Sequence, residues 1–370
     1  MIYLDYSATT PVDPRVLEVF VETSKNFYAN PNSIHDFGVL AKNKIDKTSS
    51  KIAKLFDTDC HEVIYTSGAT EANNLAIKGV AYRYQSVGKH LITTAFEHSS
   101  VSTCFSYLQK NGFDVDIVET DKDGLVDLEM LKNMIRPDTI LVSIGYVNSE
   151  TGIKQEISKI AKLLKQYTHV VFHTDMTQAV GKTNISLENV DLASLSGHKI
   201  YGIKGIGALL KKNTVFLSPL IHGGKSTTPL RGGTPSTALI VSFGKALEFV
   251  FSEMDVRIVK VKEIHEHFLK RLKEIPDFML NSNSYSINHI VNFSTMGVEA
   301  VVMQRALSKK GIYLSTQTAC SSDKAYSEFI KRLTNDELRA KTSLRVSLSH
   351  LTTTAEIDTF IQALKEEVRS

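Results

Sequence analysis

Strand-like and helix-like patterns alternate along the chain between residues 63 and 210. Short apolar runs, such as 63–66, 90–95 and 169–173, are separated by segments with helical periodicity. This alternation predicts a mostly parallel sheet with helices on both of its faces. In sheets of this kind, the ligand lies at the carboxyl ends of the strands.

The same patterns predict individual elements. Pro14 is expected to begin the first helix with Asp13 as its cap, because proline suits the first helical position and aspartate accepts from free amides. Further strands are expected at 115–118, 139–147, 190–195, 206–210, 287–293 and 344–348. Further helices are expected at 39–56, 128–135, 157–164, 239–251, 255–273, 298–309 and 355–368, one more is expected to begin near residue 70, and another is expected to include residues 101–108.

The 370 residues favour two domains, because a single core stops growing at about 250–300 residues. The bridge is expected at Phe249–Asp255. The net charge of +3 is small and the lysines are scattered, which argues against nucleic acid as the main ligand. No apolar run approaches the ~20 residues of a membrane helix, and the N-terminus lacks a signal-peptide layout. Cys60, Cys104 and Cys320 form no CxxC pair, so neither a disulfide framework nor a zinc site is indicated, and a cytoplasmic location is expected.

Lys199 is the first candidate for chemistry. It ends the run Ser196-Gly197-His198-Lys199, which lies between two apolar segments. A lysine amine in an apolar site loses its charge easily and can form a Schiff base with an aldehyde cofactor. A solvated loop lysine is the alternative.

Four other segments fall at expected strand ends. Thr66–Asn74 joins a strand to a helix start that favours an anion, although a simply capped helix is an alternative. Asp175 follows a buried strand, where a carboxylate needs a cation such as a protonated pyridine nitrogen. His98 could stack on a flat ring or move a proton, or be an ordinary core histidine. Cys320 has small polar neighbours, which suit a nucleophile better than a structural thiol.

In this order, the segments resemble the cysteine desulfurases of the NifS/IscS type, pyridoxal-phosphate enzymes of the class V aminotransferase group. The resemblance covers nearly the whole chain. It is carried by Tyr3–Thr10, Thr66–Asn74, Ser196–Lys199, Arg231–Pro235 and Leu344–Ser347, together with the segments around Asp175 and Cys320.

The resemblance implies an α/β fold of the fold type I class of pyridoxal-phosphate-dependent transferases. Residues 14–250 would form a large domain with a mainly parallel sheet of the seven-stranded type. Residues 1–13 and 251–370 would form a smaller α+β domain with the cysteine loop.

The resemblance also implies a role for each candidate. Lys199 would hold the cofactor covalently and move the α-proton, with His98 stacked on the ring. The other cofactor contacts would come from Ala69, Thr70, Asp175, Gln178, Ser196, Gly197 and His198, with Thr234 contributed by the partner subunit of a homodimer. Asn148 and Arg345 would receive the substrate, with Arg345 clamping its carboxylate.

The implied activity is conversion of L-cysteine to L-alanine, with sulfur held as a persulfide on Cys320. A sulfur-acceptor protein, either an iron–sulfur scaffold or a tRNA-thiolation enzyme, would then take the sulfur. No resident metal is implied, although Cys320 could transiently ligate an iron–sulfur cluster. No direct contact with nucleic acid or membrane is expected. A selenocysteine lyase, a class V aminotransferase and a non-catalytic sulfur-transfer scaffold are the alternatives.

Overall fold

The computed structural model describes residues 1–58, 61–224, 226–317 and 326–369 of the chain. Within these ranges, the central sheet has seven strands in the order β2-β8-β7-β6-β5-β3-β4. Neighbouring strands from β7 to β4 run parallel, whereas β8 is antiparallel to both β2 and β7. The strands are β2 (His61–Thr66), β3 (His90–Thr94), β4 (Asp114–Val118), β5 (Thr139–Ser143), β6 (Val171–Asp175), β7 (Leu192–Ser196) and β8 (Gly207–Lys212).

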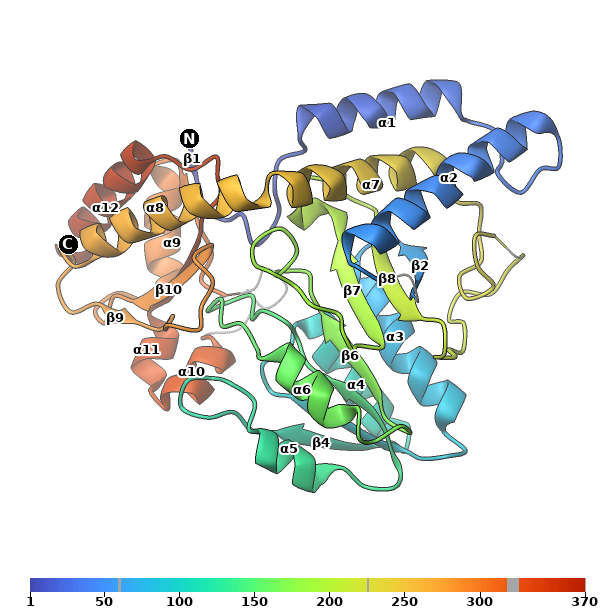
Figure 1. Cartoon of the computed structure of the whole chain (residues 1–370). Helices are drawn as coiled ribbons and strands as arrows, with labels where there is room; N and C mark the ends of the chain where they lie inside the picture. The colour runs from blue at the N-terminus through green and yellow to red at the C-terminus, as the bar shows by residue number, and fades with distance from the viewer. Residues whose placement is uncertain (59–60, 225, 318–325, 370) are drawn as a thin grey trace.

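Helices cover both faces of this sheet (Figure 1). Leu141 of β5 packs in a cluster with α3 (Ala69–Tyr84) and α4 (Ser99–Lys110), whereas the next residue, Val142, packs in a cluster with helices on the other face. Consecutive residues of a strand face opposite sides, so a sheet buried on both faces needs continuous apolar runs. The second face carries α2 (Asp36–Leu55), α6 (Ile157–Leu164) and α7 (Thr237–Ser252). Helix α1 (Pro14–Asn26) packs on α7, and α5 (Leu128–Met134) contacts β4 and α6. The predicted α/β architecture is confirmed.

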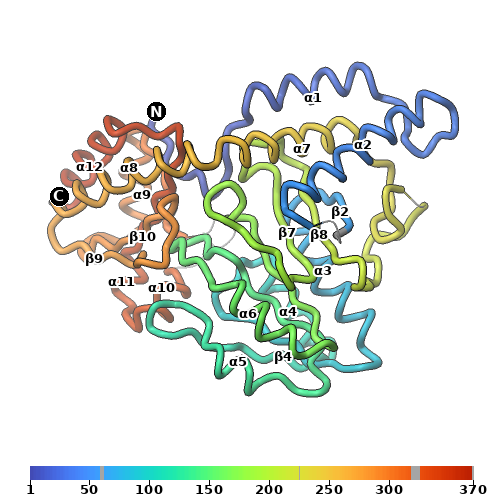
Figure 2. The backbone as a smooth tube through the Cα atoms, in the orientation of Figure 1, coloured from blue at the N-terminus to red at the C-terminus, as the bar shows by residue number. Residues whose placement is uncertain are grey.

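A second group of elements lies beside the large sheet, at the left of Figures 1 and 2, and contains both chain ends. Its own apolar cluster joins Leu4 to residues from the C-terminal third of the chain. The strands are β1 (Ile2–Tyr3) paired with β11 (Ile312–Tyr313), and an antiparallel sheet in which β10 (Ile290–Ser294) lies between β12 (Ser343–Ser347) and β9 (Met279–Leu280). The helices are α8 (Met254–Leu272), α9 (Ala300–Lys309), α10 (Glu328–Thr334), α11 (Glu337–Lys341) and α12 (Thr354–Arg369).

Helices α7 and α8 follow one another across the top of the molecule (Figure 2). They are separated by Glu253, which ends one helix and precedes the other. This break lies inside the segment 249–255 that was expected to be a bridge. The division into domains at 14–250 and at 1–13 with 251–370 stays a prediction.

Two strand boundaries differ from the expected ones. The strand expected at 139–147 ends at Ser143, although the backbone N–H groups of Ile144 and Tyr146 still donate to the β6 carbonyls of His173 and Asp175. The strand expected at 169–173 is shifted to 171–175, because the backbone N–H of Val170 closes a turn onto Tyr167. Ile144 and Tyr146 are nevertheless buried, so their apolar character reflects burial and not strand structure.

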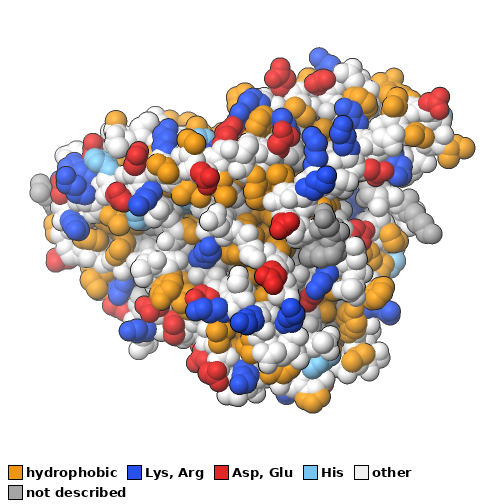
Figure 3. Space-filling view, in the orientation of Figure 1, with side chains coloured by type: hydrophobic (Ala, Val, Ile, Leu, Met, Phe, Trp, Pro, Cys, Tyr) orange, Lys and Arg blue, Asp and Glu red, His pale blue; other side chains and the backbone are white. Residues whose placement is uncertain are grey.

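Basic and acidic side chains are interspersed on the face drawn in Figure 3. Within the described ranges, none of the helices has the length and apolar character needed to span a membrane.

Candidate active site

A cavity of about 570 Å³ opens where strands of the large sheet end. It is lined by residues at or shortly after the ends of β2, β3, β5 and β7, and by Asp175, the last residue of β6. Ten of the predicted site residues line this cavity: Ala69, Thr70, His98, Asn148, Asp175, Gln178, Ser196, His198, Lys199 and Arg345. The structure therefore brings these ten residues together around one cavity, and their roles stay predictions.

Lys199 ends a 3-10 turn, Gly197–Lys199, that leaves β7 at the cavity floor. Its Nζ donates to the backbone carbonyls of Ser7 and Ala8, the latter at 2.8 Å. Gly197 is buried behind the turn and does not line the cavity. At Gly207, where the chain returns in β8, a Cβ would lie 2.7 Å from Gly68 Cα, so only glycine lets this strand approach the loop before α3.

The amine-binding carbonyls come from the N-terminal segment, which sequence reasoning did not assign to the site. Thr10 donates its backbone N–H to His198 O at 2.9 Å, which ties this segment to the lysine turn. The resemblance had marked Tyr3–Thr10 only as a family feature. A backbone carbonyl carries no residue-specific pattern, so no side chain could have indicated this contact.

Asp175 is held by two donors. Its Oδ1 accepts the backbone N–H of Thr177 at 2.9 Å, and its Oδ2 accepts from Asn73 Nδ2 at 2.8 Å. Asn73 is fully buried on α3 and also donates to Ser100 Oγ at 2.9 Å. Both carboxylate oxygens are therefore fixed, and the group is oriented before any ligand binds.

His98 is the N-cap of α4. Its Nδ1 accepts the backbone N–H of Ser100 at 3.1 Å, which leaves the ring proton on Nε2 in the neutral tautomer. Burial lowers the pKa of His98, and the charges of Lys199 and Arg345 act in the same direction against that of Asp175. The imidazole is thus held neutral at the cavity wall.

Glu97 precedes His98 and also lines the cavity, although no role had been assigned to it. Its Oε1 accepts from Gly145 N at 3.0 Å and from Thr94 Oγ1 at 2.8 Å. Burial raises the pKa of Glu97 to about 7, and the charge of Asp175 adds to this. The site therefore holds an acid that titrates near neutrality.

The start of α3 supplies the anion-binding edge of the cavity. Ala69 and Thr70 form its first turn, where backbone N–H groups have no intrahelical acceptor. Ser196 and His198 lie on the same cavity, and His198 Nδ1 is 3.2 Å from Thr9 Oγ1. Burial lowers the pKa of His198 to about 4, so the ring is neutral near pH 7.

Arg345 and Asn148 lie on the side of the cavity toward the second group of elements. Arg345 comes from β12, is 1% exposed, and donates to Asp5 Oδ1 at 2.8 Å and to Ser149 O at 3.1 Å. Its Nε is buried without a hydrogen-bond partner. Asn148 donates to Phe96 O at 3.1 Å. Arg345 lines the cavity, and each of its two terminal nitrogens carries a second N–H beyond these bonds, as a carboxylate-binding residue requires.

Two of the predicted residues that the structure describes, Gly197 and Thr234, do not line this cavity. Thr234 lines a separate, smaller cavity together with Thr66, Ser67 and Gly205. Cys320 lies outside the described residues. Ser315, five residues before it, exchanges two backbone hydrogen bonds with Arg345, at 3.2 and 2.7 Å.

A partly buried aspartate, a lysine, a helix start and a neutral histidine around one cavity at the strand ends are groups that can hold a phosphorylated ring cofactor in an α/β enzyme. The model of the family described as "Aminotransferase class-V" matches residues 2–360. The chain belongs to this family of pyridoxal-phosphate enzymes and, within it, to the cysteine desulfurases.

Cysteine desulfurase IscS of Mannheimia succiniciproducens is 41% identical to the chain, over all of this chain and 93% of that protein. The mitochondrial cysteine desulfurase of Arabidopsis thaliana is 39% identical over 99% of this chain and 82% of its own length. A solved structure described as a NifS-like protein matches with a TM-score of 0.93 and 32% identity, covering 100% of this chain and 99% of that one. A structure of SspA in complex with cysteine matches with a TM-score of 0.84 and 33% identity, covering 95% and 100%.

Proposed function

We propose that this protein uses pyridoxal phosphate to convert L-cysteine to L-alanine and to hold the released sulfur as a persulfide on Cys320. The observation that carries the proposal is the convergence of Lys199, Asp175 and the start of α3 on one cavity of about 570 Å³. The family relationship supports this chemistry, and the SspA structure in complex with cysteine supports cysteine as the substrate.

The residues present fit pyridoxal phosphate. Asp175 offers a fixed carboxylate for a protonated ring nitrogen, and the buried Oγ1 of Thr177 beside it has no hydrogen-bond partner. Ala69, Thr70, Ser196 and His198 would hold the phosphate, Gln178 the ring hydroxyl, and Lys199 the aldehyde carbon, with Gly197 keeping the lysine turn tight and His98 lying against the ring. Bound pyridoxal phosphate supplies an aldehyde that captures the substrate amine and a ring that accepts an electron pair from Cα.

The protein's own groups position the substrate and move protons. Arg345 would bind the substrate carboxylate with the second N–H groups of its terminal nitrogens, and Asn148 would contact the substrate beside it. The amine of Lys199, held by the Ser7 and Ala8 carbonyls, would take the proton from Cα and later return it to carbon. Neutral His98 would be available to carry a second proton.

Cys320 would complete the reaction as a thiolate nucleophile. The Cβ–S bond of cysteine breaks, an S–S bond to Cys320 forms, and Cβ receives a proton to give the methyl group of alanine. L-Cysteine and one protein thiol therefore give alanine and one persulfide, with no external oxidant. The persulfide then passes to an acceptor protein, an iron–sulfur scaffold or a tRNA-thiolation enzyme, in a reducing compartment such as the cytoplasm.

The test is to measure alanine and protein persulfide together. With pyridoxal phosphate and L-cysteine, Cys320→Ser should lose persulfide and nearly all alanine formation. Cys104→Ser is the matched control, because Cys104 is buried and burial raises the pKa of its thiol to about 11. Full alanine formation by Cys320→Ser would instead favour a lyase or transaminase that needs no thiol, and wild-type protein without alanine or bound cofactor would favour a non-catalytic scaffold.

A homodimer is the second part of the proposal, because Thr234 does not line its own chain's cofactor cavity. The loop that carries Thr234 is anchored to α3 of its own chain by Arg231, whose Nε donates to Glu71 Oε1 at 2.9 Å. Thr234 would reach the phosphate site of the other subunit. Sedimentation of wild-type protein as a monomer under assay conditions would refute this part.

A further inference from the structure

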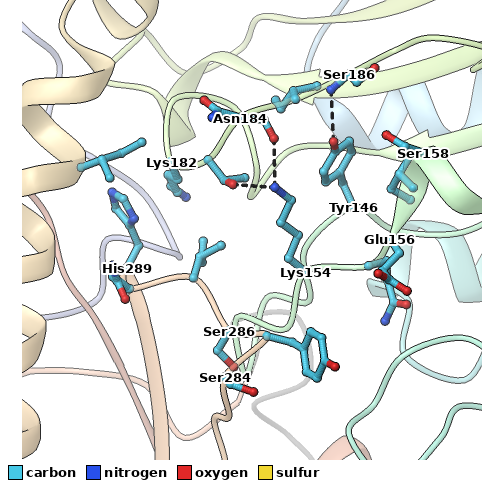
Figure 4. Close-up of a pocket in the computed structure, with 18 of the residues that line it drawn as sticks. Tyr146, Lys154, Glu156, Ser158, Lys182, Asn184, Ser186, Ser284, Ser286 and His289 are labelled. Carbon is cyan, nitrogen blue, oxygen red and sulfur yellow. Dashed lines mark hydrogen bonds between the residues drawn. The ribbon is translucent and has the colours of Figure 1, made fainter.

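A second cavity, of about 870 Å³, is drawn in Figure 4 and shares Gln155 with the candidate active site. Lys182, Lys154 and His289 lie on its walls. Lys182 is partly exposed, but its Nζ donates to Oε1 of Gln178 at 2.6 Å, and Gln178 lines the cofactor cavity. Lys182, on the wall of the second cavity, is therefore hydrogen-bonded to a side chain that lines the cofactor cavity.

The contact with Lys182 decides which end of the Gln178 amide faces which neighbour. An amide has one oxygen acceptor and one nitrogen with two donors, and a lysine ammonium has donors only. Oε1 must therefore face Lys182. Nε2 donates to Ser7 O at 2.9 Å, the same carbonyl that accepts from Lys199. This bond uses one Nε2 hydrogen and leaves the other for an acceptor in the cofactor cavity.

The neighbouring charges that act on the ammonium group of Lys182 are positive. Burial lowers the pKa of Lys182 to about 7, and the nearby charges of Lys199 and Arg345 lower it further. Burying the charged amine of Lys182 therefore costs free energy, which an apolar side chain at this position would not cost. An anionic ring oxygen on the far side of Gln178 would offset that cost, because it would accept from the amide that Lys182 polarises.

We propose that Lys182 is a positioning residue for the cofactor, which fixes the amide of Gln178 so that its N–H groups, and not its oxygen, face the ring hydroxyl oxygen of pyridoxal phosphate. This inference rests on the proposed function, because it assumes that pyridoxal phosphate occupies the first cavity. It adds a residue that does not itself line that cavity.

The experiment measures the dissociation constant of pyridoxal phosphate from apoprotein by titration, without any turnover. Lys182→Met removes the donor and should weaken binding by about 10- to 100-fold, the range for an oriented hydrogen bond to a charged group. Lys182→Arg retains donors for Oε1 and should stay within about threefold of wild type. The matched control is Lys154→Met, because Lys154 lies on the same cavity but donates to Thr183 Oγ1 at 2.8 Å and Asn184 O at 3.1 Å, as the dashed lines in Figure 4 show.

A double-mutant cycle separates positioning from general damage. If Lys182 acts through Gln178, then Lys182→Met should cause little further loss of affinity in a Gln178→Leu background. Equal weakening by Lys182→Met and Lys154→Met, or full additivity in the cycle, would overturn the inference. Wild-type protein that binds no pyridoxal phosphate would instead overturn the proposed function, so the two failures are distinguishable.

Discussion

Replacing Arg345 by lysine should weaken the use of L-cysteine while leaving cofactor binding intact. The guanidinium donates to Asp5 and to the carbonyl of Ser149, and its buried Nε has no partner in the described structure. A lysine keeps the charge but lacks the planar fork of a guanidinium, so it cannot bind a substrate carboxylate through two parallel hydrogen bonds. The loss of at least one charged hydrogen bond costs about 1.5–3 kcal/mol, or roughly 10- to 150-fold in kcat/KM.

The assay is alanine formation over a range of L-cysteine concentrations, together with the dissociation constant of pyridoxal phosphate. Arg339→Lys is the matched control, because Arg339 likewise donates to two oxygens, Asn281 Oδ1 at 2.6 Å and Leu280 O at 3.0 Å, but does not line the cavity. Arg339→Lys should keep wild-type kinetics. An unchanged kcat/KM in Arg345→Lys, or an equal loss in both variants, would refute the assignment of Arg345 to the substrate carboxylate.

Three further predictions concern other buried groups. Asp175→Asn keeps an acceptor for the Thr177 N–H but loses the charge that would pair with the protonated ring nitrogen. Single-turnover alanine formation should therefore slow by roughly 100-fold, which corresponds to the loss of a buried ion pair of about 3 kcal/mol. Burial raises the pKa of Glu97 to about 7, so the protonated side chain contributes stability that is lost as the pH rises from the ordinary pKa of a glutamate through 7. The Tm of Glu97→Gln apoprotein should therefore fall less than the Tm of wild type between pH 6 and 8.5. Burial lowers the pKa of His289 from 6.5 to about 3, so the free energy of unfolding falls as the pH drops below 6.5, by about 2 kcal/mol at pH 5. In urea titrations, the free energy of unfolding of His289→Leu should fall less over this pH range than that of wild type. An equal loss in both proteins would contradict this account.

The fold could be predicted from the sequence because four strands of the parallel region, β3, β5, β6 and β7, are buried on both faces. Runs such as Leu141-Val142 are apolar without interruption and are bounded by helical patterns. The same reasoning failed at residues 144–147, because Ile144 and Tyr146 are buried in a loop and apolar character alone does not distinguish a loop from a strand. The two-residue strands β1, β9 and β11 were not predicted, since two residues show no periodicity.

The side chains of the site could be predicted where a strand end and a reactive residue coincide, as at Asp175 and Lys199. Contacts between distant segments could not. Lys182 lies four residues after Gln178 in a turn, and nothing in its type distinguishes it from the other lysines of the chain. Its contact with Gln178 depends on how the chain turns after β6, which no local pattern specifies.

The placement of Arg345 has a consequence for how the two halves of the reaction are joined. Arg345 pairs with Asp5 of the N-terminal segment through its side chain and with Ser315 through its backbone. Asp5 lies two and three residues before Ser7 and Ala8, whose backbone carbonyls hold Lys199. Ser315 lies five residues before Cys320. A substrate carboxylate bound at Arg345 would therefore lie between the segment that holds the proton-transferring amine and the segment that leads to the sulfur-accepting thiol. Arg345, buried in the second group of elements, thus contacts both segments, the first through its side chain and the second through its backbone.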